Sequence, residues 1–455
     1  MGVDVGQCDP LETIMGVGLL LTGSYPTEGE TRSAEDWLEQ VASWIEGHEE
    51  EPLMVCHVGV NGDEQPVLSI QIHPSAEDVE LAVPEAGVCV VSAKTSTAGP
   101  GYHIFLCDLL NALGTQFHIE WDGPEEGEED AGDETGYFYT HDADAVRTEM
   151  LRWLSALARV VVENCQDEDV GIRMVSMPLD CSYPDQPQIV TPAGPRDQAW
   201  FEHLVENPEH GIGFFPWWPE GVGAAFFLGR ALCRLWQDIR WRTPITEDEG
   251  ELLMDVHLDL ERAYHLDPGC DMPWREWRTL IEYLNEYFGY AEFQHEEGLE
   301  AEIERRAAAI DPAQPLIGYR RGRVSITLTG GWSLTIPGEM AEEWEPSGET
   351  WGAWHGGRTI WFTSWSISGD DDEVLSAQEI LEGRPWPEEG RIFEFQDGPL
   401  VGRAVFMPYE EDGETLWNLK GYSAIEGSFA LCSVYLQDEN DLEWALEIWK
   451  SLRNG

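Results

Sequence analysis

Residues 87–113 read GVCVVSAKTSTAGPGYHIFLCDLLNAL, and this stretch decides how the first part of the chain folds. Its apolar opening, Gly87–Ala93, predicts a strand, and Tyr102–Leu113 predicts a helix. The Thr, Ser, Gly and Pro residues between them predict a turn, with the helix beginning near Gly101. The stretch therefore predicts a strand, a turn and a helix that follow one another directly.

The same turn is a candidate for ligand binding. Backbone N–H groups at a helix start attract anions, and hydroxyl groups and one of the chain's three lysines lie beside this one. His103 and Cys107 are four residues apart on the predicted helix, within reach as a base and a nucleophile. The candidate anion-binding residues are Lys94, Thr95, Ser96, Gly101, His103 and Cys107. Neither the phosphate-loop spacing nor the dinucleotide fingerprint is present, which favours a structural turn with Cys107 packed in the core.

Outward from this unit, residues 1–190 alternate helix and strand patterns. Ser33–Glu46, which opens with an S-x-x-D pattern, and Ala143–Asn164 predict helices. Further strands are predicted at Ile14–Leu21, Leu53–Val60, Val67–Ile72, Gln116–Trp121 and Gly171–Met177. The acidic, glycine-rich residues 122–136 predict a solvated loop. The mixed order predicts an α+β domain with a partly antiparallel sheet.

Proline-rich sequence at 177–195 separates this domain from a helical module predicted over residues 196–309. Its helices are expected at Arg196–Val205, Gly221–Trp241, Glu247–His265, Trp274–Tyr287 and Glu297–Ala309. The aromatic run 211–227 contains four candidate partner-binding residues, Phe214, Phe215, Trp217 and Trp218. If they are exposed, they form an apolar patch suited to a protein partner or a small ligand; the alternative is burial between domains.

Residues 316–455 predict an antiparallel, β-rich α+β domain. The strands are expected at Arg323–Leu328, Trp332–Ile336, Trp351–Trp354, Thr359–Ile367, Arg391–Phe395, Ala404–Tyr409, Leu416–Ala424 and Gly427–Leu436. The amphipathic segment Asp441–Arg453 predicts a closing helix that packs across the sheet. With GGWSLTIP at 330–337 and EIWKSL at 447–452, this segment resembles the Mog1/PsbP-like α/β/α fold. Members of that fold are mostly adaptors and binding proteins, so the resemblance implies interaction rather than catalysis, and it transfers no site residues.

The charge of the chain restricts its partners. Asp and Glu number 87 against 26 Lys and Arg, which gives a formal net charge of −61. A field of that sign repels nucleic acids and anionic membranes and attracts basic proteins. The nine cysteines form no C-x-x-C pair, and no secretory signal is visible, so we expect a cytoplasmic protein without a membrane span.

No catalytic motif, metal-ligand spacing or cofactor motif is recognisable in the sequence, so no catalytic residue, cofactor or metal is predicted. The leading hypothesis is a non-enzymatic, acidic protein that binds a basic protein partner, such as a bacterial toxin-neutralising (immunity) protein or a defence-system accessory factor. The alternative is an enzyme or a nucleotide- or phosphate-binding protein that uses the turn at 94–108.

Overall fold

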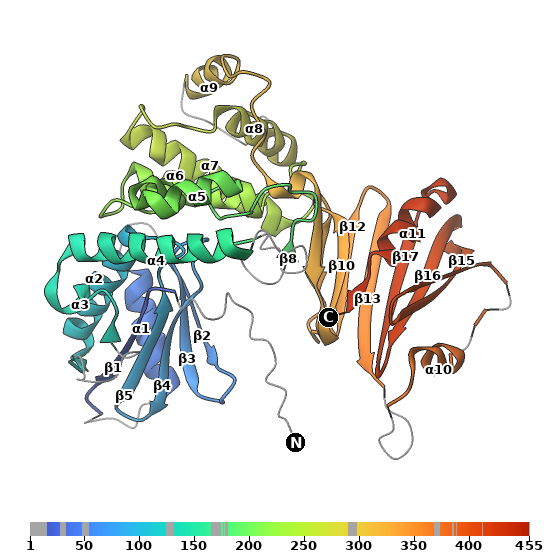
Figure 1. Ribbon diagram of the computed structural model, residues 1–455, viewed down its shortest axis with the longest axis horizontal. Coiled ribbons are helices and arrows are strands. Elements are labelled where there is room, and N and C mark those ends of the chain that lie inside the picture. Colours follow the sequence, from blue (N-terminus) through green and yellow to red (C-terminus); the bar gives the residue numbers. More distant parts are fainter. Residues whose placement is uncertain are drawn as a thin grey trace.

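The structure is a computed structural model of the 455-residue chain. It describes residues 16–27, 33–47, 54–123, 132–164, 174–175, 177, 181–289, 298–367, 374–384, 386–387, 389–411 and 413–454. Figure 1 shows an N-terminal sheet, a stack of helices above it and two further sheets toward the C-terminal end. This arrangement of helices with antiparallel sheets confirms the predicted α+β fold class.

The N-terminal sheet has the strand order β2-β3-β4-β5-β1-β6, with β7 also paired to β1. All of these pairings are antiparallel. The strands are β1 (Gly18–Ser24), β2 (Val55–Val60), β3 (Pro66–Gln71), β4 (Val79–Glu85), β5 (Val88–Lys94), β6 (Glu120–Trp121) and β7 (Gly132–Asp133). The helices of this part are α1 (Ala34–Glu46), α2 (Pro100–Phe117), α3 (Tyr137–Thr140) and α4 (Ala143–Asn164).

One face of this sheet carries the apolar side chains. In β5, Cys89 and Val91 are fully buried, whereas the Ser92 side chain is exposed. Successive side chains of a strand point to opposite faces, so this alternation gives the sheet one apolar face. Helices α1 and α2 pack on that face and meet each other, with the rings of Trp37 and Phe117 edge to face at 6.2 Å.

The central helices continue the same core. They are α5 (Gln198–Glu206), η1 (Pro208–Phe214), α6 (Ala224–Gln237), α7 (Glu247–Leu266), α8 (Trp274–Phe288) and α9 (Leu299–Ala307). Helix α4 contacts α2 on one side and α5 on the other, and so joins the sheet to this stack (Figure 1). Most of the buried apolar side chains between Val17 and Ala307 belong to one hydrophobic cluster, whereas Tyr183 and Val190 belong to the C-terminal core. The domain boundary predicted at residues 190–196 stays a prediction. Buried side chains on both sides of it belong to the same hydrophobic cluster.

The C-terminal part has a core of its own, built by two sheets and α11 (Leu442–Lys450). The smaller sheet has the order β18-β10-β9-β8 and the larger has the order β11-β12-β13-β17-β16-β15-β14. The smaller sheet contains β8 (Cys181–Ser182), β9 (Arg323–Thr327), β10 (Trp332–Pro337) and β18 (Arg453–Asn454). The larger contains β11 (Ala341–Trp344), β12 (Thr350–His355), β13 (Arg358–Ser366), β14 (Arg391–Asp397), β15 (Leu400–Glu411), β16 (Glu414–Ile425) and β17 (Ser428–Leu436).

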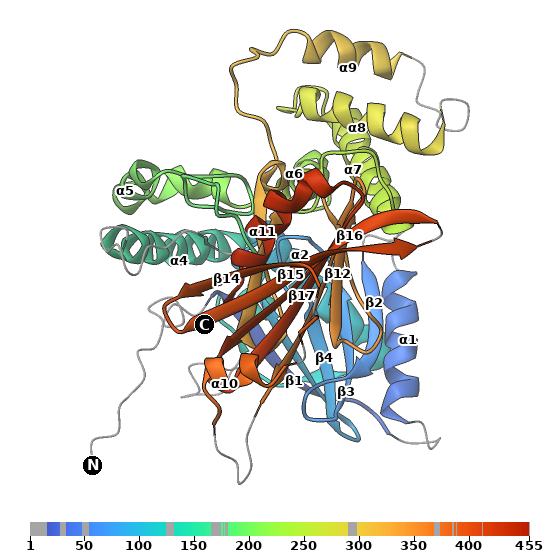
Figure 2. The same cartoon turned by 90° about the vertical axis from the view of Figure 1, so that its right-hand side faces the viewer.

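Helix α11 lies across the strands of the larger sheet, as Figure 2 shows. Its Trp449 is fully buried and donates a hydrogen bond from Nε1 to Ser423 Oγ at 3.1 Å. Gly421 makes room for the ring, since a Cβ there would lie 2.3 Å from Trp449 Cδ1. A short helix, α10 (Ala377–Glu382), contacts strands β15, β16 and β17. The predicted closing helix is confirmed, and the Mog1/PsbP-like resemblance stays a prediction.

Several predicted elements are confirmed and some are wrong. Helix α4 has the predicted bounds, and α1 begins with a capping box between Ser33 and Asp36. The strand predicted at Gln116–Trp121 is wrong at its start, because α2 continues through Phe117 and only β6 remains of the strand. Strands β4 and β11 and helix α10 were not predicted. Most of the strand predicted at Gly171–Met177 lies outside the described residues.

Arginine side chains connect the two cores. Arg240 and Arg242, which follow α6, donate to the backbone carbonyls of Met340 at 2.8 Å and Glu339 at 2.7 Å. Arg320 pairs with Glu342 at 2.7 Å, and both side chains are largely buried. These contacts fix the central helices against the start of the larger sheet. None of the helices that the structure describes is long and apolar enough to cross a membrane.

Candidate functional site

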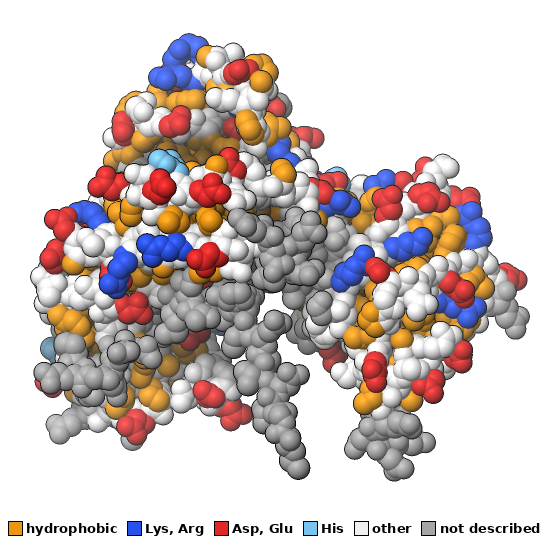
Figure 3. Space-filling view, in the orientation of Figure 1, with side chains coloured by type: hydrophobic (Ala, Val, Ile, Leu, Met, Phe, Trp, Pro, Cys, Tyr) orange, Lys and Arg blue, Asp and Glu red, His pale blue; other side chains and the backbone are white. Residues whose placement is uncertain are grey.

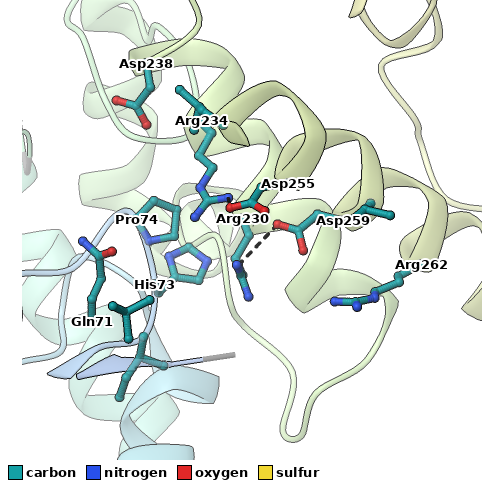
Figure 4. A pocket seen from close by; sticks show the side chains of 13 residues that line it. Gln71, His73, Pro74, Arg230, Arg234, Asp238, Asp255, Asp259 and Arg262 are labelled. Atoms are coloured by element: carbon teal, nitrogen blue, oxygen red, sulfur yellow. Dashed lines mark hydrogen bonds and ion pairs between the residues drawn. The ribbon is translucent and has the colours of Figure 1, made fainter. Parts of the chain in front are cut away.

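A pocket of about 620 Å³ lies where the N-terminal sheet meets helices α6 and α7. The sheet contributes the start of β2 and the end of β3, which are neighbours in the hairpin. Figure 4 shows Gln71, His73 and Pro74 on the sheet side and the charged side chains of the two helices opposite them. The lining residues are Val55, Gln71, Ile72, His73, Pro74, Arg230, Arg234, Asp238, Leu252, Asp255, Leu258, Asp259 and Arg262.

The spacing of four residues brings two ion pairs into the pocket. Arg230 and Arg234 lie one turn apart on α6, and Asp255 and Asp259 lie one turn apart on α7. Arg230 Nε is 3.3 Å from Asp259 Oδ2, and Arg234 Nη1 is 3.2 Å from Asp255 Oδ2. The earlier arginine pairs with the later aspartate, as it must when the two helices run antiparallel.

The two ion pairs differ in their surroundings. The pair Arg234–Asp255 is the outer pair, and its Asp255 side chain is 57% exposed. The pair Arg230–Asp259 is the inner pair, in which Asp259 is 3% and Arg230 is 11% exposed. Neither Arg230 Nε nor Asp259 Oδ2 makes a well-aligned hydrogen bond, although the two atoms are close. The Arg230 guanidinium also lies over the ring of Phe226, 5.3 Å from its centroid. The inner arginine is therefore held by its charge and by an aromatic face, with donor capacity left over.

His73 adds a second buried donor. The Ser75 backbone N–H donates to His73 Nδ1 at 3.2 Å, so in the neutral ring the proton is on Nε2. Nε2 is buried and has no hydrogen-bond partner. Burial, together with the charges of Arg230 and Arg234, lowers the pKa of His73 to about 3, so the ring is neutral at physiological pH.

Asp259 is the carboxyl group of the inner ion pair, and its pKa is raised. Burial raises the pKa of Asp259 to about 6; Arg230 and Arg234 oppose this shift, and Asp255 adds to it. Burial also lowers the pKa of Arg230 from its ordinary value. A carboxyl group in a cleft with a pKa near neutrality is typical of functional sites, because small changes in its surroundings change its charge.

Buried polar atoms without partners are rare in folded proteins, because each one costs about 1–3 kcal/mol when water is withdrawn. Here His73 Nε2 has no hydrogen-bond partner, and Arg230 Nε and Asp259 Oδ2 make only their ion-pair contact of 3.3 Å with each other; all three atoms belong to residues that line one pocket. Two are donors and the third is an acceptor that becomes a donor when protonated. The arrangement is suited to bind a small group that accepts hydrogen bonds and carries negative charge.

The candidates from the 94–108 turn lie elsewhere, and none of them lines this pocket. Lys94 is exposed and 3.6 Å from Glu77, whereas Thr95 and Ser96 are buried. The Gly101 N–H at the start of α2 donates to the Trp217 carbonyl at 2.9 Å. A Cβ at Gly101 would lie 2.2 Å from the Pro219 carbonyl oxygen, so the chain around Trp217 covers this helix start. Anion binding at the turn stays a prediction.

His103 and Cys107 do lie together inside the protein, with 3.5 Å between Nε2 and Sγ. Burial, with the charge of Asp133, raises the pKa of the Cys107 thiol well above its ordinary value, so the thiol is a poor nucleophile. The sequence did not indicate Asp133 as a partner, because it falls in the stretch assigned to a solvated loop. That assignment is wrong at this residue: the Asp133 side chain is fully buried. Residues 124–131 of the stretch lie outside the described residues.

The aromatic candidates form interior structure. Phe214, Phe215 and Trp217 are buried, and Trp218 is half-buried. Trp217 packs 6.2 Å from the His73 ring and thus supports the wall of the pocket. The burial alternative therefore describes the first three residues.

The residues that make the pocket were missed by sequence reasoning. Arg230 stands alone in the apolar segment 221–233, and an isolated charge on a buried helix face is the one signal that could have found it.

Comparisons with known proteins identify no family. No protein-family description matches the chain, and no curated protein matches its sequence. Among solved structures, one from Bacteroides thetaiotaomicron VPI-5482 is 10% identical, with a TM-score of 0.24. The match covers 30% of this chain and about half, 49%, of that one. A likeness of this size carries no argument about fold or function.

Proposed function

We propose that the protein binds a small organic anion, with a carboxylate or phosphate group, in the pocket between β3, α6 and α7. The observation that supports this proposal is that three arginines, Arg230, Arg234 and Arg262, line an open volume of about 620 Å³. An anion there would accept hydrogen bonds from guanidinium groups, and a charge-assisted hydrogen bond from arginine is about twice as strong as a neutral one.

The charge of the whole chain makes this pocket unusual. Three arginines, Arg230, Arg234 and Arg262, line it in a protein of formal net charge −61. The distant field repels anions, so an anion can be held only where donors are concentrated and water is excluded. Protonation of Asp259 removes one negative charge and turns an acceptor into a donor, so anion binding should strengthen as the pH falls toward 6.

The test is a thermal-shift and calorimetric screen with mono- and dicarboxylates, inorganic phosphate and nucleotides. A ligand at 100 times its Kd stabilises the native state by about 2.7 kcal/mol, which a melting curve resolves. The Arg230→Met variant should lose the shift, whereas Arg305→Met, on the exposed face of α9, should keep it. No shift with any of these ligands, or an undiminished shift in Arg230→Met, would exclude the proposal.

A second candidate function is binding of a basic protein partner, as an immunity protein or a defence-system accessory factor. The formal net charge of −61 is the observation that favours it. On the face in Figure 3 the acidic side chains are interspersed with basic and apolar side chains rather than gathered in one continuous patch. Salt distinguishes the two candidates: capture of a basic protein from a lysate of the source cell should fall steeply between low and high salt, while binding of a small anion in a buried pocket should change little.

We also propose that the C-terminal part, residues 316–455, is a Mog1/PsbP-like domain and that the protein is cytoplasmic. The antiparallel sheet with α11 across it supports the first. The second is supported by the seven described cysteines, none of which is in a disulfide, since thiols persist in reducing compartments. Thiol labelling and fractionation of the source cell test the location.

A further inference from the structure

His103, Cys107 and Asp133 form a buried triad outside the pocket. The first two lie one turn apart on α2, and Asp133 is in β7, paired with Leu19 of β1. His103 Nε2 is 3.0 Å from Asp133 Oδ1 and 3.5 Å from Cys107 Sγ, and Sγ is 3.9 Å from Asp133 Oδ2. One ligand atom from each residue lies within 4.8 Å of the other two, and the residue types are those that hold zinc.

The hydrogen bonds around the triad leave a positive charge missing between His103 and Asp133. Thr95 Oγ1 donates its proton to the Val17 carbonyl at 3.1 Å, so it accepts from His103 Nδ1–H at 2.8 Å. In the neutral ring Nε2 then carries a lone pair, which faces the Asp133 carboxylate at 3.0 Å. Thr135 Oγ1 lies 2.9 Å from both atoms, but it has one proton to give. A cation between the ring and the carboxylate, either a proton or a metal ion, relieves this contact.

The distances within the triad are compatible with a metal ion as well as with a proton. Tetrahedral zinc with bonds of about 2.0 Å to nitrogen and oxygen and about 2.3 Å to sulfur separates its ligands by about 3.3 Å (N to O) and about 3.5 Å (S to N or O). In the triad, Nε2 lies 3.5 Å from Sγ and 3.0 Å from Asp133 Oδ1, whereas the 3.9 Å contact joins Sγ to the other carboxylate oxygen, Oδ2. A proton accounts for the nitrogen–oxygen contact, whereas a metal ion would also account for a sulfur atom at the distance from Nε2 that two zinc ligands have.

We propose that His103 Nε2, Cys107 Sγ and Asp133 bind one Zn²⁺ ion, with the Thr135 hydroxyl as the nearest fourth ligand. The surrounding contacts already orient these groups: Thr95 fixes the imidazole through Nδ1, and the Phe138 N–H donates to Asp133 Oδ2 at 2.7 Å. On binding, the Cys107 S–H bond breaks, the sulfur lone pair forms the Zn–S bond, and the proton is released to solvent. The ion would fasten β7 and the following segment to α2.

The zinc is tested on the purified full-length chain, expressed in zinc-supplemented medium and dialysed without chelator. Elemental analysis should find about one zinc per chain, and X-ray absorption at the zinc edge should show one sulfur among nitrogen and oxygen ligands. Less than about a tenth of an equivalent of zinc, or a spectrum with no sulfur or with several, would overturn the proposal.

Substitutions of single residues test whether the zinc ion is bound by His103, Cys107 and Asp133. Cys107→Ser and Asp133→Asn should each retain at least tenfold less zinc, and Thr95→Val about tenfold less, because it removes only the group that orients the ring. Cys89→Ser is the matched control, since Cys89 is a fully buried thiol on β5 that contacts the Gly23 carbonyl. Unchanged zinc in the first two variants contradicts the assignment. If they fail to fold, wild-type chain from cobalt-supplemented medium decides, because a single thiolate ligand gives a charge-transfer band and its absence excludes Cys107.

Discussion

Two regions of the molecule place a histidine and an aspartate below the surface, and they do so in opposite ways. Around His103 and Asp133 the polar atoms have partners: two threonine hydroxyls, two backbone N–H groups and a thiol. Around His73 and Asp259, Nε2 and Oδ2 have no hydrogen-bond partner, and about 620 Å³ of open space lies beside them. The contacts around His103 and Asp133 hold segments together and orient the groups that we propose as zinc ligands, whereas the charged groups of the pocket lie beside a space that a ligand can enter.

The largest effect that this comparison predicts follows from Asp133→Ala. The change removes the acceptor of the Thr135 N–H at 2.8 Å and the Phe138 N–H at 2.7 Å and leaves His103 without its carboxylate. Breaking such a buried network by removing one partner costs about 3–5 kcal/mol of unfolding free energy. Urea unfolding followed by tryptophan fluorescence measures the loss.

Asp108→Ala is the control for this prediction. Asp108 lies on α2, the helix of His103 and Cys107, but its side chain is 56% exposed and its ion pair with His141 spans 3.9 Å. Its carboxylate also accepts a hydrogen bond from the Tyr137 hydroxyl at 3.3 Å. A surface pair of this kind contributes about 0–1 kcal/mol. If Asp133→Ala is no more destabilising than Asp108→Ala, the triad does not hold the fold together.

The pH dependence of stability should separate the pocket from the rest of the chain. Because the pKa of Asp259 is raised to about 6 in the folded protein, its contribution to stability is full below about pH 4 and is lost as the pH rises through 6. The amplitude is about 3 kcal/mol for a shift of roughly two pH units. Asp259→Asn abolishes this component, so the wild-type minus variant difference between pH 4 and 7 measures it. A difference that does not change with pH would mean that Asp259 titrates normally beside Arg230, Arg234 and Asp255.

Replacing the inner ion pair by apolar groups tests whether the pocket serves the fold. In the double variant Arg230→Met with Asp259→Leu, no charge is left unpaired, and such replacements are often neutral or stabilising by about 1–4 kcal/mol. We expect unfolding free energy equal to or above that of the wild type at pH 7, together with complete loss of anion binding by calorimetry. Severe destabilisation would show that the pair is a structural contact like the triad.

The sequence predicts local structure well where one short pattern specifies it. The S-x-x-D pattern at Ser33 predicted the start of α1, and the apolar periodicity of 143–164 predicted α4 with its observed bounds. Strand β4 was missed, since its residues VELAVPE include Pro84 next to a register shift between Ala82 and Glu85. Proline usually excludes a strand, and only the irregular pairing with β5 accommodates it here.

The two candidate sites differ in the same respect: residues close together in the sequence could be predicted to meet, and residues far apart could not. His103 and Cys107 are four residues apart on one helix, so their proximity could be predicted from spacing. The pocket could not be, because residue 73 lies more than 150 positions before Arg230, and only the packing of α6 on the sheet brings them together. Asp133 was hidden for another reason: in a stretch of many carboxylates, composition predicts solvent exposure and cannot identify the one that is buried.

The smallest predicted effect concerns Lys94, at the edge of the turn from which the sequence suggested anion binding. Its ammonium group lies 3.6 Å from Glu77, and the two side chains are 62% and 71% exposed. An exposed pair at that distance contributes little, so Lys94→Ala should change the unfolding free energy by less than about 0.5 kcal/mol. It should also leave the ligand-induced thermal shift intact, because the pocket does not include this residue. Loss of the shift in Lys94→Ala, with Arg230→Met still binding, would move the anion site from the pocket to the turn at 94–108.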